Sequence, residues 1–269
     1  RLSNVVRYSK PIERYANTWV EKGDTGDAFT TVQIQSNGAK SGKPYSDALN
    51  RSGYNTGLAT IGGNPTWVTT VGDPFGGANT ALFFNGVNDY ISFADSSDWN
   101  PTGAFTFESW VYWITVGDYA LLFEQAASHN DRFRCAYISG TDRLNVDWYN
   151  GGPSVDANIQ FVLNEQFSPN EWHHIVVERT GSAQAECNWE GFCDGVGLRV
   201  GGHSNLDDAI HNISAAMCFG GRDWSGTNDN YHDFWHGYMD NIRWSNGIAR
   251  YGGISLRTTQ QVITSSNSD

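Results

Sequence analysis

Hydrophobic and polar residues alternate along much of the chain from about residue 80 onward. In FTFESWVYW (105–113), Phe105, Phe107 and Trp113 fall on one side of an extended strand, and Glu108 falls on the other. Period-two segments of this kind, separated by turns such as NGVND, predict an antiparallel sandwich or barrel of about eight to twelve strands. The alternation recurs in ALFFNGVNDYISFA (81–94), DRFRCAYI (131–138), RLNVDWY (143–149), EWHHIVVERTG (171–181), GVGLRVGG (195–202), AAMCFGG (215–221) and GYMDNIRWS (237–245).

The last of these segments carries an acid among apolar residues. In an uninterrupted strand, Tyr238, Asp240, Ile242 and Trp244 share one face, which we expect to be the core face. Asp89 stands in a similar apolar setting at the start of an earlier strand. A buried carboxylate without a partner costs several kcal/mol. Two such acids could share a cation such as Ca²⁺, which takes hard oxygen ligands, or each could accept backbone N–H groups instead.

The pattern divides the chain into three regions. Residues 1–66 are polar with short apolar bursts and predict an extended arm or small β subdomain, joined through IGGNP (61–65) to the sandwich. The sandwich is expected over residues 67–252, with a tail at 253–269. The chain opens with Arg1, which suggests that an upstream piece has been removed or left out.

Charge is distributed unevenly along the sequence. The net charge is −12. Residues 1–51 hold eight Lys/Arg and five Asp/Glu, a net of +3, whereas residues 52–269 hold nine Arg and 24 Asp/Glu, a net of −15. The break suggests a basic arm lying on an acidic neighbour, although chance would produce it as well. So acidic a sandwich argues against nucleic acid as a partner.

The amino-acid composition narrows the class of protein further. The 30 Gly and many aromatic residues favour strands joined by turns. No apolar run approaches the roughly 20 residues that span a bilayer, and no signal peptide is visible. Cys187 and Cys193 are spaced for a small disulfide loop, but free, half-buried thiols are the preferred interpretation. The cysteines show no paired C-x-x-C spacing, so a structural zinc site is not expected.

The order of five motifs identifies a resemblance. FFNGVNDYISF, FTFESWVYW, WHHIVVERTG, LRVGG and GYMDNIRWSNGIARYGG occur in the order typical of the laminin-G-like, concanavalin-A-like lectin/glucanase superfamily. The chain resembles that superfamily over about residues 80–252, and departs from it where AQAECNWEGFCDGV (183–196) carries extra material. The resemblance implies an all-β, antiparallel jelly-roll β-sandwich (concanavalin-A-like) with an extended N-terminal arm. The RWSNGIARY ending is similar to that of bacteriophage virion proteins.

The resemblance also bears on metal and catalysis. The superfamily often holds a structural calcium between early and late strands. Asp240 matches the late position, and Asn85, Asn88 and Asp89 fall near the early one. The E-x-D-x-E run of the family's glycosidases is absent, FESW offers only Glu108, and the lyase blocks are missing. No catalytic residue is predicted and the protein is expected not to be an enzyme.

Histidines give a weaker signal. HDFWH has the spacing of a zinc motif, but Asp replaces the required Glu and the preceding GTNDNY favours a loop, so zinc is not expected there. Trp172, His173 and His174 fit a framework strand of the family, and we expect these histidines to be hydrogen-bonded structural residues.

A ligand site is predicted in the long segment GGRDWSGTNDNYHDFW (220–235). Sugars stack on aromatic rings and bond to amides and carboxylates, which this segment supplies, although Gly/Asn/Asp loops are also ordinary turn chemistry. The sheet face that bears Arg132, Arg134 or Trp148 is a second option. The candidate ligand residues are Arg222, Trp224, Asn228, Asp229, Asn230, His232 and Trp235.

The leading hypothesis is a non-enzymatic structural or adhesion protein, a phage virion component such as a capsid decoration, fibre or spike. Its arm would fasten it to other virion or surface proteins, and its copies are expected to form a homo-oligomer. The expected location is a virion or an extracellular or cell surface. The alternative is a secreted carbohydrate-binding lectin module, followed by a glycan hydrolase or lyase.

Overall fold

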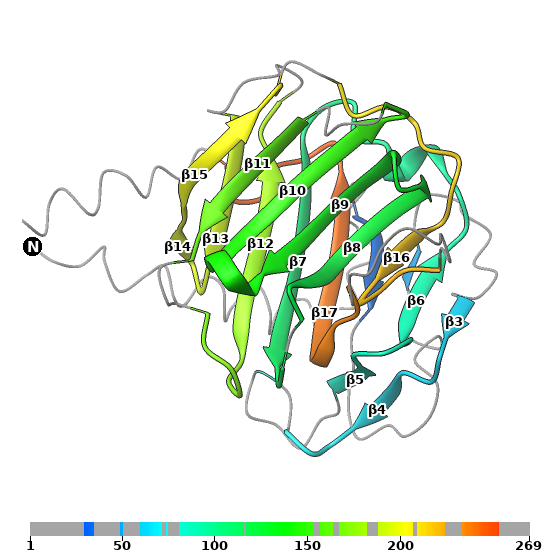
Figure 1. The fold of residues 1–269 in the computed structure, drawn as a ribbon, viewed down its shortest axis with the longest axis vertical. Coiled ribbons are helices and arrows are strands. Elements are labelled where there is room, and N and C mark those ends of the chain that lie inside the picture. Colours follow the sequence, from blue (N-terminus) through cyan, green and yellow to red (C-terminus); the bar gives the residue numbers. More distant parts are fainter. Residues whose placement is uncertain are drawn as a thin grey trace, which may run out of the picture.

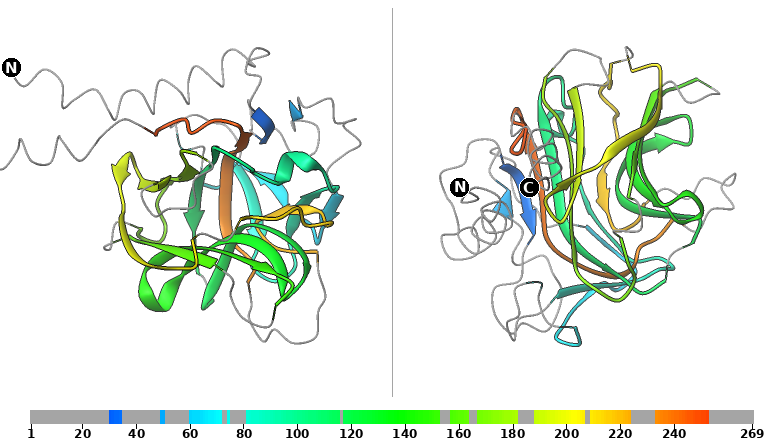
Figure 2. Two further views of the ribbon diagram at one scale, coloured as in Figure 1. Left: turned by 90° about the horizontal axis from the view of Figure 1, so that it is seen from above. Right: turned by 90° about the vertical axis from the view of Figure 1, so that its left-hand side faces the viewer.

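Two antiparallel β-sheets pack face to face in the computed structural model (Figure 1, Figure 2). We call the nine-stranded sheet, in which β17 is central, the back sheet, and the eight-stranded sheet, which faces the viewer of Figure 1, the front sheet. The structure describes residues 30–34, 49–50, 60–71, 74, 81–115, 117–152, 157–163, 167–181, 188–206, 209–223 and 233–252.

The back sheet has the order β14-β13-β12-β7-β17-β1-β2, and β5 also pairs with β17 and with β4. Its strands are β1 (Thr30–Ile34), β2 (Leu49–Asn50), β4 (Thr66–Val68), β5 (Ala81–Asn85), β7 (Phe105–Trp113), β12 (His173–Arg179), β13 (Trp189–Cys193), β14 (Val196–Gly197) and β17 (His236–Asn246).

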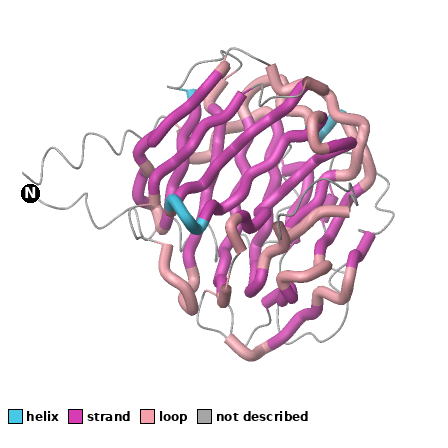
Figure 3. Tube along the Cα trace, in the orientation of Figure 1, coloured by secondary structure: helices cyan, strands magenta, loops and turns pink. Residues whose placement is uncertain are grey.

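The front sheet has the order β15-β11-β10-β9-β8-β16-β6-β3. The 3₁₀ turns Ser97–Trp99 and Ser139–Thr141 interrupt the otherwise strand-dominated trace (Figure 3). The strands of the front sheet are β3 (Thr60–Gly62), β6 (Tyr90–Phe93), β8 (Tyr119–Ser128), β9 (Asp131–Ile138), β10 (Arg143–Asn150), β11 (Ala157–Val162), β15 (Arg199–Ser204) and β16 (Met217–Phe219).

Aromatic rings from both sheets fill the space between them. The Phe107 ring of β7 lies 4.9 Å from the Phe123 ring of β8, and the Trp244 ring of β17 lies 5.2 Å from the same Phe123. All three side chains are fully buried. Alternate residues of each strand point to the same face, so the period-two pattern of the sequence becomes this shared core. The predicted all-β jelly-roll sandwich is confirmed.

One expectation about β17 is wrong because the strand contains a β-bulge. Asp240 pairs with Trp110 of β7, but the register shifts before Arg243, and Asn241 has a φ of 48°. One extra residue exchanges the faces of the strand. Tyr238 and Asp240 therefore point to the outer face of the back sheet, whereas Ile242 and Trp244 point into the core.

Parts of the predicted arm belong to the sheets. β1 pairs with β17, and β3 pairs with β6 in the front sheet. Val32 and Ile34 of β1 are buried in the core. The remainder of residues 1–59 and the tail 253–269 lie outside the described residues, so their roles as arm and tail stay predictions. Within the described residues, no helix has the length and apolar character needed to cross a membrane.

Candidate binding site on the front sheet

Charged side chains form a cluster on the outer face of the front sheet. Asp147 of β10 stands opposite Arg134 of β9, and its carboxylate accepts from the Nε atoms of Arg134 at 2.9 Å and Arg132 at 3.3 Å. The Asn145 amide donates to the same carboxylate at 2.7 Å. All four side chains are buried. Charge-assisted hydrogen bonds of this geometry hold both guanidinium groups in fixed positions.

The two ends of the predicted ligand segment meet at this cluster. Arg222 Nη2 lies 2.7 Å from Asp233 Oδ2, and Arg134 Nη1 lies 3.8 Å from the same oxygen. The Asp233 carbonyl accepts from Leu121 N of β8 at 2.9 Å. We call this Arg222–Asp233–Arg134 arrangement the loop clamp. It ties the residues on either side of segment 223–232 to strands β8 and β9.

A third acid lies beside the loop clamp. Glu124 of β8 stands opposite Arg134 and is 1% exposed. Burial raises the pKa of this carboxyl against the opposing pull of Arg134, Arg222 and Arg132. A buried acid with a raised pKa is a marker of functional sites, although structural ion-pair networks produce the same effect. Nothing in the alternation of the sequence distinguished Glu124 from its neighbours.

Aromatic rings border the arginines on this face. The Arg132 guanidinium carbon lies 4.5 Å from the centre of the Tyr149 ring, and that of Arg134 lies 5.3 Å from the Tyr119 ring. Cation–π contacts of this kind are worth about 0.5–2 kcal/mol each, most when desolvated. The arginines of this face are therefore held in place between carboxylates on one side and aromatic rings on the other.

The structure places only some of the predicted ligand residues in this region. Arg222 lies in the loop clamp as described above. The prediction of Trp235 as a ligand residue is wrong, because its side chain is fully buried in the core. Trp148 is likewise not exposed, since it stacks on Trp189 between the sheets at 5.4 Å. The other predicted ligand residues lie outside the described residues: Trp224, Asn228, Asp229, Asn230 and His232.

The early acid of the predicted calcium site is satisfied by backbone N–H groups. Asp89 Oδ1 accepts from Asn64 N at 2.6 Å, and Oδ2 accepts from Asn85 N at 2.9 Å. Asn85 Oδ1 accepts from the backbone N–H groups of Val87 and Asn88, and the Asn85 amide donates to Asn88 Oδ1. Since N–H groups point at these oxygens, the turn does not present them to a cation. The residues do not fit calcium as arranged.

The late acid lies apart from that turn. Asn85 pairs with His236, and Asp240 is four residues farther along β17, a separation of about 13 Å at the usual rise of a strand. Asp240 Oδ1 accepts from Asn241 N at 2.7 Å. Asp240, Asp89, Asn85 and Asn88 therefore do not surround one point, and a single ion bound by all four is excluded. Calcium binding stays a prediction of the sequence to which this geometry adds no support.

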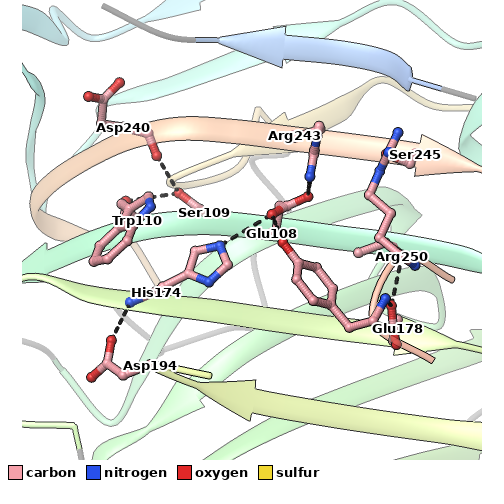
Figure 4. A network of polar contacts seen from close by, with 12 residues as sticks. Glu108, Ser109, Trp110, His174, Glu178, Asp194, Asp240, Arg243, Ser245 and Arg250 are labelled. Atoms are coloured by element: carbon pink, nitrogen blue, oxygen red, sulfur yellow. Dashed lines mark hydrogen bonds and ion pairs between the residues drawn. The ribbon is translucent and has the colours of Figure 1, made fainter. Parts of the chain in front are cut away.

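A second polar network covers the outer face of the back sheet (Figure 4). Glu108 of β7 forms an ion pair with Arg243 of β17, and its Oε2 lies 3.2 Å from His174 Nε2 and 2.5 Å from the Tyr251 hydroxyl. Burial acts to raise the pKa of Glu108, but Arg243 and His174 hold it well below its usual range. The network fastens Arg250 and Tyr251 to the sheet. His174 is hydrogen-bonded, as predicted.

Glu178 lies in the same network, but its pKa is raised, whereas that of Glu108 is lowered. Its Oε2 accepts from the Thr106 hydroxyl at 3.0 Å and from Tyr251 N at 3.1 Å. Burial raises the pKa of Glu178 to about 7 against these hydrogen bonds, with Glu190 acting in the same direction as burial. No cation forms an ion pair with Glu178 among the contacts of the described residues. Its charged form is therefore disfavoured in the folded protein.

This imbalance predicts a pH dependence of stability. The folded pKa lies above the ordinary value of 4.5, so the folded state binds the proton more tightly, and stability falls as pH rises from about 4.5 to about 7. Glu178→Gln removes this contribution. We expect the melting temperature of the variant, relative to wild type, to rise between pH 5 and pH 8. The control is Asp118→Asn, which changes an exposed acid and should show no such trend. If the melting temperatures of wild type and Glu178→Gln change in parallel over this pH range, the raised pKa of Glu178 is contradicted.

The chain belongs to the concanavalin A-like lectin/glucanases superfamily, whose laminin-G-type family model matches residues 85–249. No curated protein sequence matches the chain. Among solved structures, domain 4 of AbnA, a GH43 extracellular arabinanase from Geobacillus stearothermophilus in complex with arabinotriose, is 16% identical with a TM-score of 0.56. The match covers 82% of this chain and 94% of that domain.

Two toxin domains are similar at lower identity. The binding domain of botulinum neurotoxin serotype D is 10% identical with a TM-score of 0.52, over 87% of this chain and 52% of that one. The second is a structure of botulinum neurotoxin type C, a toxin whose cell entry is described as dependent on interaction with two ganglioside molecules. It is 12% identical with a TM-score of 0.50, and the match covers 81% of this chain and 47% of that one. This chain thus spans about half of each toxin structure. At these identities the similarity concerns the fold.

Proposed function

We propose that this protein is a non-enzymatic adhesion protein whose sandwich binds glycans through segment 223–232. The observation that carries the proposal is the loop clamp, since Arg222 and Asp233 hold both ends of this segment on the front sheet. The segment, DWSGTNDNYH, supplies two aromatic rings together with amide and carboxylate groups. Binding residues are commonly carried by segments that connect the strands of a rigid scaffold.

The neighbours support a glycan as the ligand class. The arabinanase domain was solved with arabinotriose, and the type C neurotoxin structure is described in terms of gangliosides. Catalysis finds less support. Glycosidases need a pair of carboxylates that can act on the sugar, whereas Asp147 and Asp233 of the front sheet are both engaged by arginines and Glu124 beside them is only 1% exposed.

A glycan array that includes arabinan, ganglioside, algal and bacterial oligosaccharides tests the proposal. We expect wild type to bind at least one glycan class and Trp224→Ala to weaken that binding roughly tenfold or more, as the loss of an aromatic anchor does. Trp110→Ala, on the outer face of the back sheet, is the matched control and should bind as wild type does. The proposal is overturned if wild type binds nothing on the array, or if both variants lose glycan binding equally. Release of reducing ends from a bound polysaccharide would show that the protein is an enzyme.

The proposal includes display of the sandwich on a virion or cell surface, with residues 1–29 as the attachment segment and several copies side by side. The support is the resemblance of the RWSNGIARY ending and the charge break between residues 1–51 and the rest. Deletion must end before β1, because Val32 and Ile34 are part of the core. A chain lacking residues 1–29 should fold and bind glycan but fail to co-sediment with particles. Normal incorporation would remove the attachment role.

A further inference from the structure

Three metal-ligating side chains lie together at one end of the back sheet. They are His173 at the start of β12, Cys193 at the end of β13, and Asp194 in the turn that follows. One ligand atom from each, Nδ1, Sγ and a carboxylate oxygen, lies within 4.8 Å of the other two. Within the described ranges no other set of three His, Cys, Asp or Glu residues meets this condition. The cluster is separate from the loop clamp on the front sheet.

Strand pairing brings the three residues together. β12 and β13 are antiparallel, and Ile175 stands opposite Cys193, so the start of β12 lies beside the turn after β13. Asp194 N donates to the His174 carbonyl at 2.9 Å, and His174 N donates to Asp194 Oδ1 at 2.8 Å. The second carboxylate oxygen, Oδ2, is thereby directed at His173 Nδ1, 2.8 Å away, and at Cys193 Sγ, 3.9 Å away.

The imidazole ring is held from its other side. His173 Nε2 lies 3.1 Å from both the backbone nitrogen and the carbonyl oxygen of Ser168, and 3.6 Å from the Glu171 carboxylate. The ring also packs against Phe167 at 5.2 Å. Metal-binding histidines typically donate the second ring N–H to a carbonyl or carboxylate, which fixes the tautomer and ring orientation. With Nδ1 on a metal, Nε2 carries the proton and donates to the Ser168 carbonyl, in place of accepting from the Ser168 N–H as it does in the other tautomer.

We propose that His173 Nδ1, Cys193 Sγ and Asp194 Oδ2 bind a Zn²⁺ ion, with a fourth position left for water. Around tetrahedral zinc, bond lengths of about 2.0–2.3 Å separate the nitrogen and oxygen ligands by about 3.3 Å and the sulfur and oxygen ligands by about 3.5 Å. The observed nitrogen–oxygen separation of 2.8 Å and sulfur–oxygen separation of 3.9 Å require shifts of about half an ångström or less, and the nitrogen–sulfur separation, which lies within 4.8 Å, has to close to about 3.5 Å. Small side-chain rotations supply such shifts.

The donor set and its surroundings favour this ion. One thiolate and one carboxylate balance the 2+ charge, and a thiolate with an imidazole is preferred by zinc and similar transition metals rather than by calcium, which takes oxygen ligands. His173 and Cys193 are buried, whereas the Asp194 side chain is 43% exposed. The ion can therefore enter from the Asp194 side. This site uses one cysteine, which is why C-x-x-C spacing did not indicate it.

Titration of the metal-free full chain with Co²⁺ in reducing buffer tests the proposal. Co²⁺ bound to a thiolate gives a near-ultraviolet charge-transfer band. We expect this band to saturate at about one equivalent in wild type and to disappear when Zn²⁺ is added, whereas Ca²⁺ leaves it unchanged. Cys193→Ala should abolish the band. Cys135→Ala, which alters a buried cysteine in β9, is the matched control and should keep it.

Asp194→Asn provides a second variant in case Cys193→Ala does not fold, because its side chain is partly exposed. We expect Asp194→Asn to weaken Co²⁺ binding tenfold or more with an unchanged circular dichroism spectrum. The proposal is overturned if folded wild type shows no saturable thiolate band, or if the band persists in Cys193→Ala or is unaltered in Asp194→Asn. Glycan binding enters none of these measurements, so this proposal and the proposed function stand or fall separately.

Discussion

Replacing Trp244 by alanine should lower the free energy of unfolding by about 3–5 kcal/mol, the range for the loss of a large buried aromatic side chain. The Trp244 ring is fully buried, lies 5.2 Å from both Phe105 and Phe123, and joins the two sheets. Its indole N–H donates to the Asp98 carbonyl at 3.2 Å, and alanine leaves that carbonyl without this donor. Urea denaturation measures the loss.

Trp110→Ala is the control for this prediction. Trp110 lies on the same sheet but on its outer face, where it is only partly buried. We expect a clearly smaller loss of stability from it. Equal losses in the two variants would mean that β17 does not place Trp244 in the core, and the face exchange at the Asn241 bulge would then be wrong.

Glu108→Ala should lower the free energy of unfolding by about 3–5 kcal/mol, because it leaves the buried Arg243 guanidinium without its carboxylate. The change also removes the acceptor for the Tyr251 hydroxyl and for His174 Nε2. Chemical denaturation at pH 7, with the exposed acid variant Asp118→Ala as control, measures the difference. The control should change stability by less than about 0.5 kcal/mol.

Acid titration sharpens this prediction. The folded pKa of Glu108 lies below the ordinary value of 4.5, so its contribution is present above that pH and is lost as pH falls below it. The difference in stability between wild type and Glu108→Ala should therefore shrink toward pH 3. A difference that stays constant over this range would indicate that the loss came from packing rather than from the ionised carboxylate.

The fold was predictable because strand alternation is a local property. The segments around Phe107, Phe133 and Val146 each show which residues face the core, and the structure buries those residues between the sheets. The same rule failed at Asp240. A bulge adds one residue, and after it every side chain faces the opposite way. The letters MDNIR show an asparagine suited to a positive φ, but only the pairing with β7 shows that it is used.

The site was predictable only in part. The sequence indicated a loop rich in aromatic and amide groups, and Arg222 proved to lie at its base. It also assigned Trp235 to the ligand, although that ring fills the core. Asp233 and Glu124, which complete the charged face with Arg134, were missed because their roles depend on contacts with β8 and β9.

Sequence by itself determined the class of fold, the superfamily and the position of the loop that we propose to bind glycans, since each depends on residues close together along the chain. Tertiary structure decided which acids meet which cations, which tryptophans are buried, and that His173 lies beside Cys193 and Asp194, some 20 residues later. The physical reason is register. Antiparallel pairing brings distant residues within ångströms, and that register depends on bulges, turns and core packing along the whole sheet.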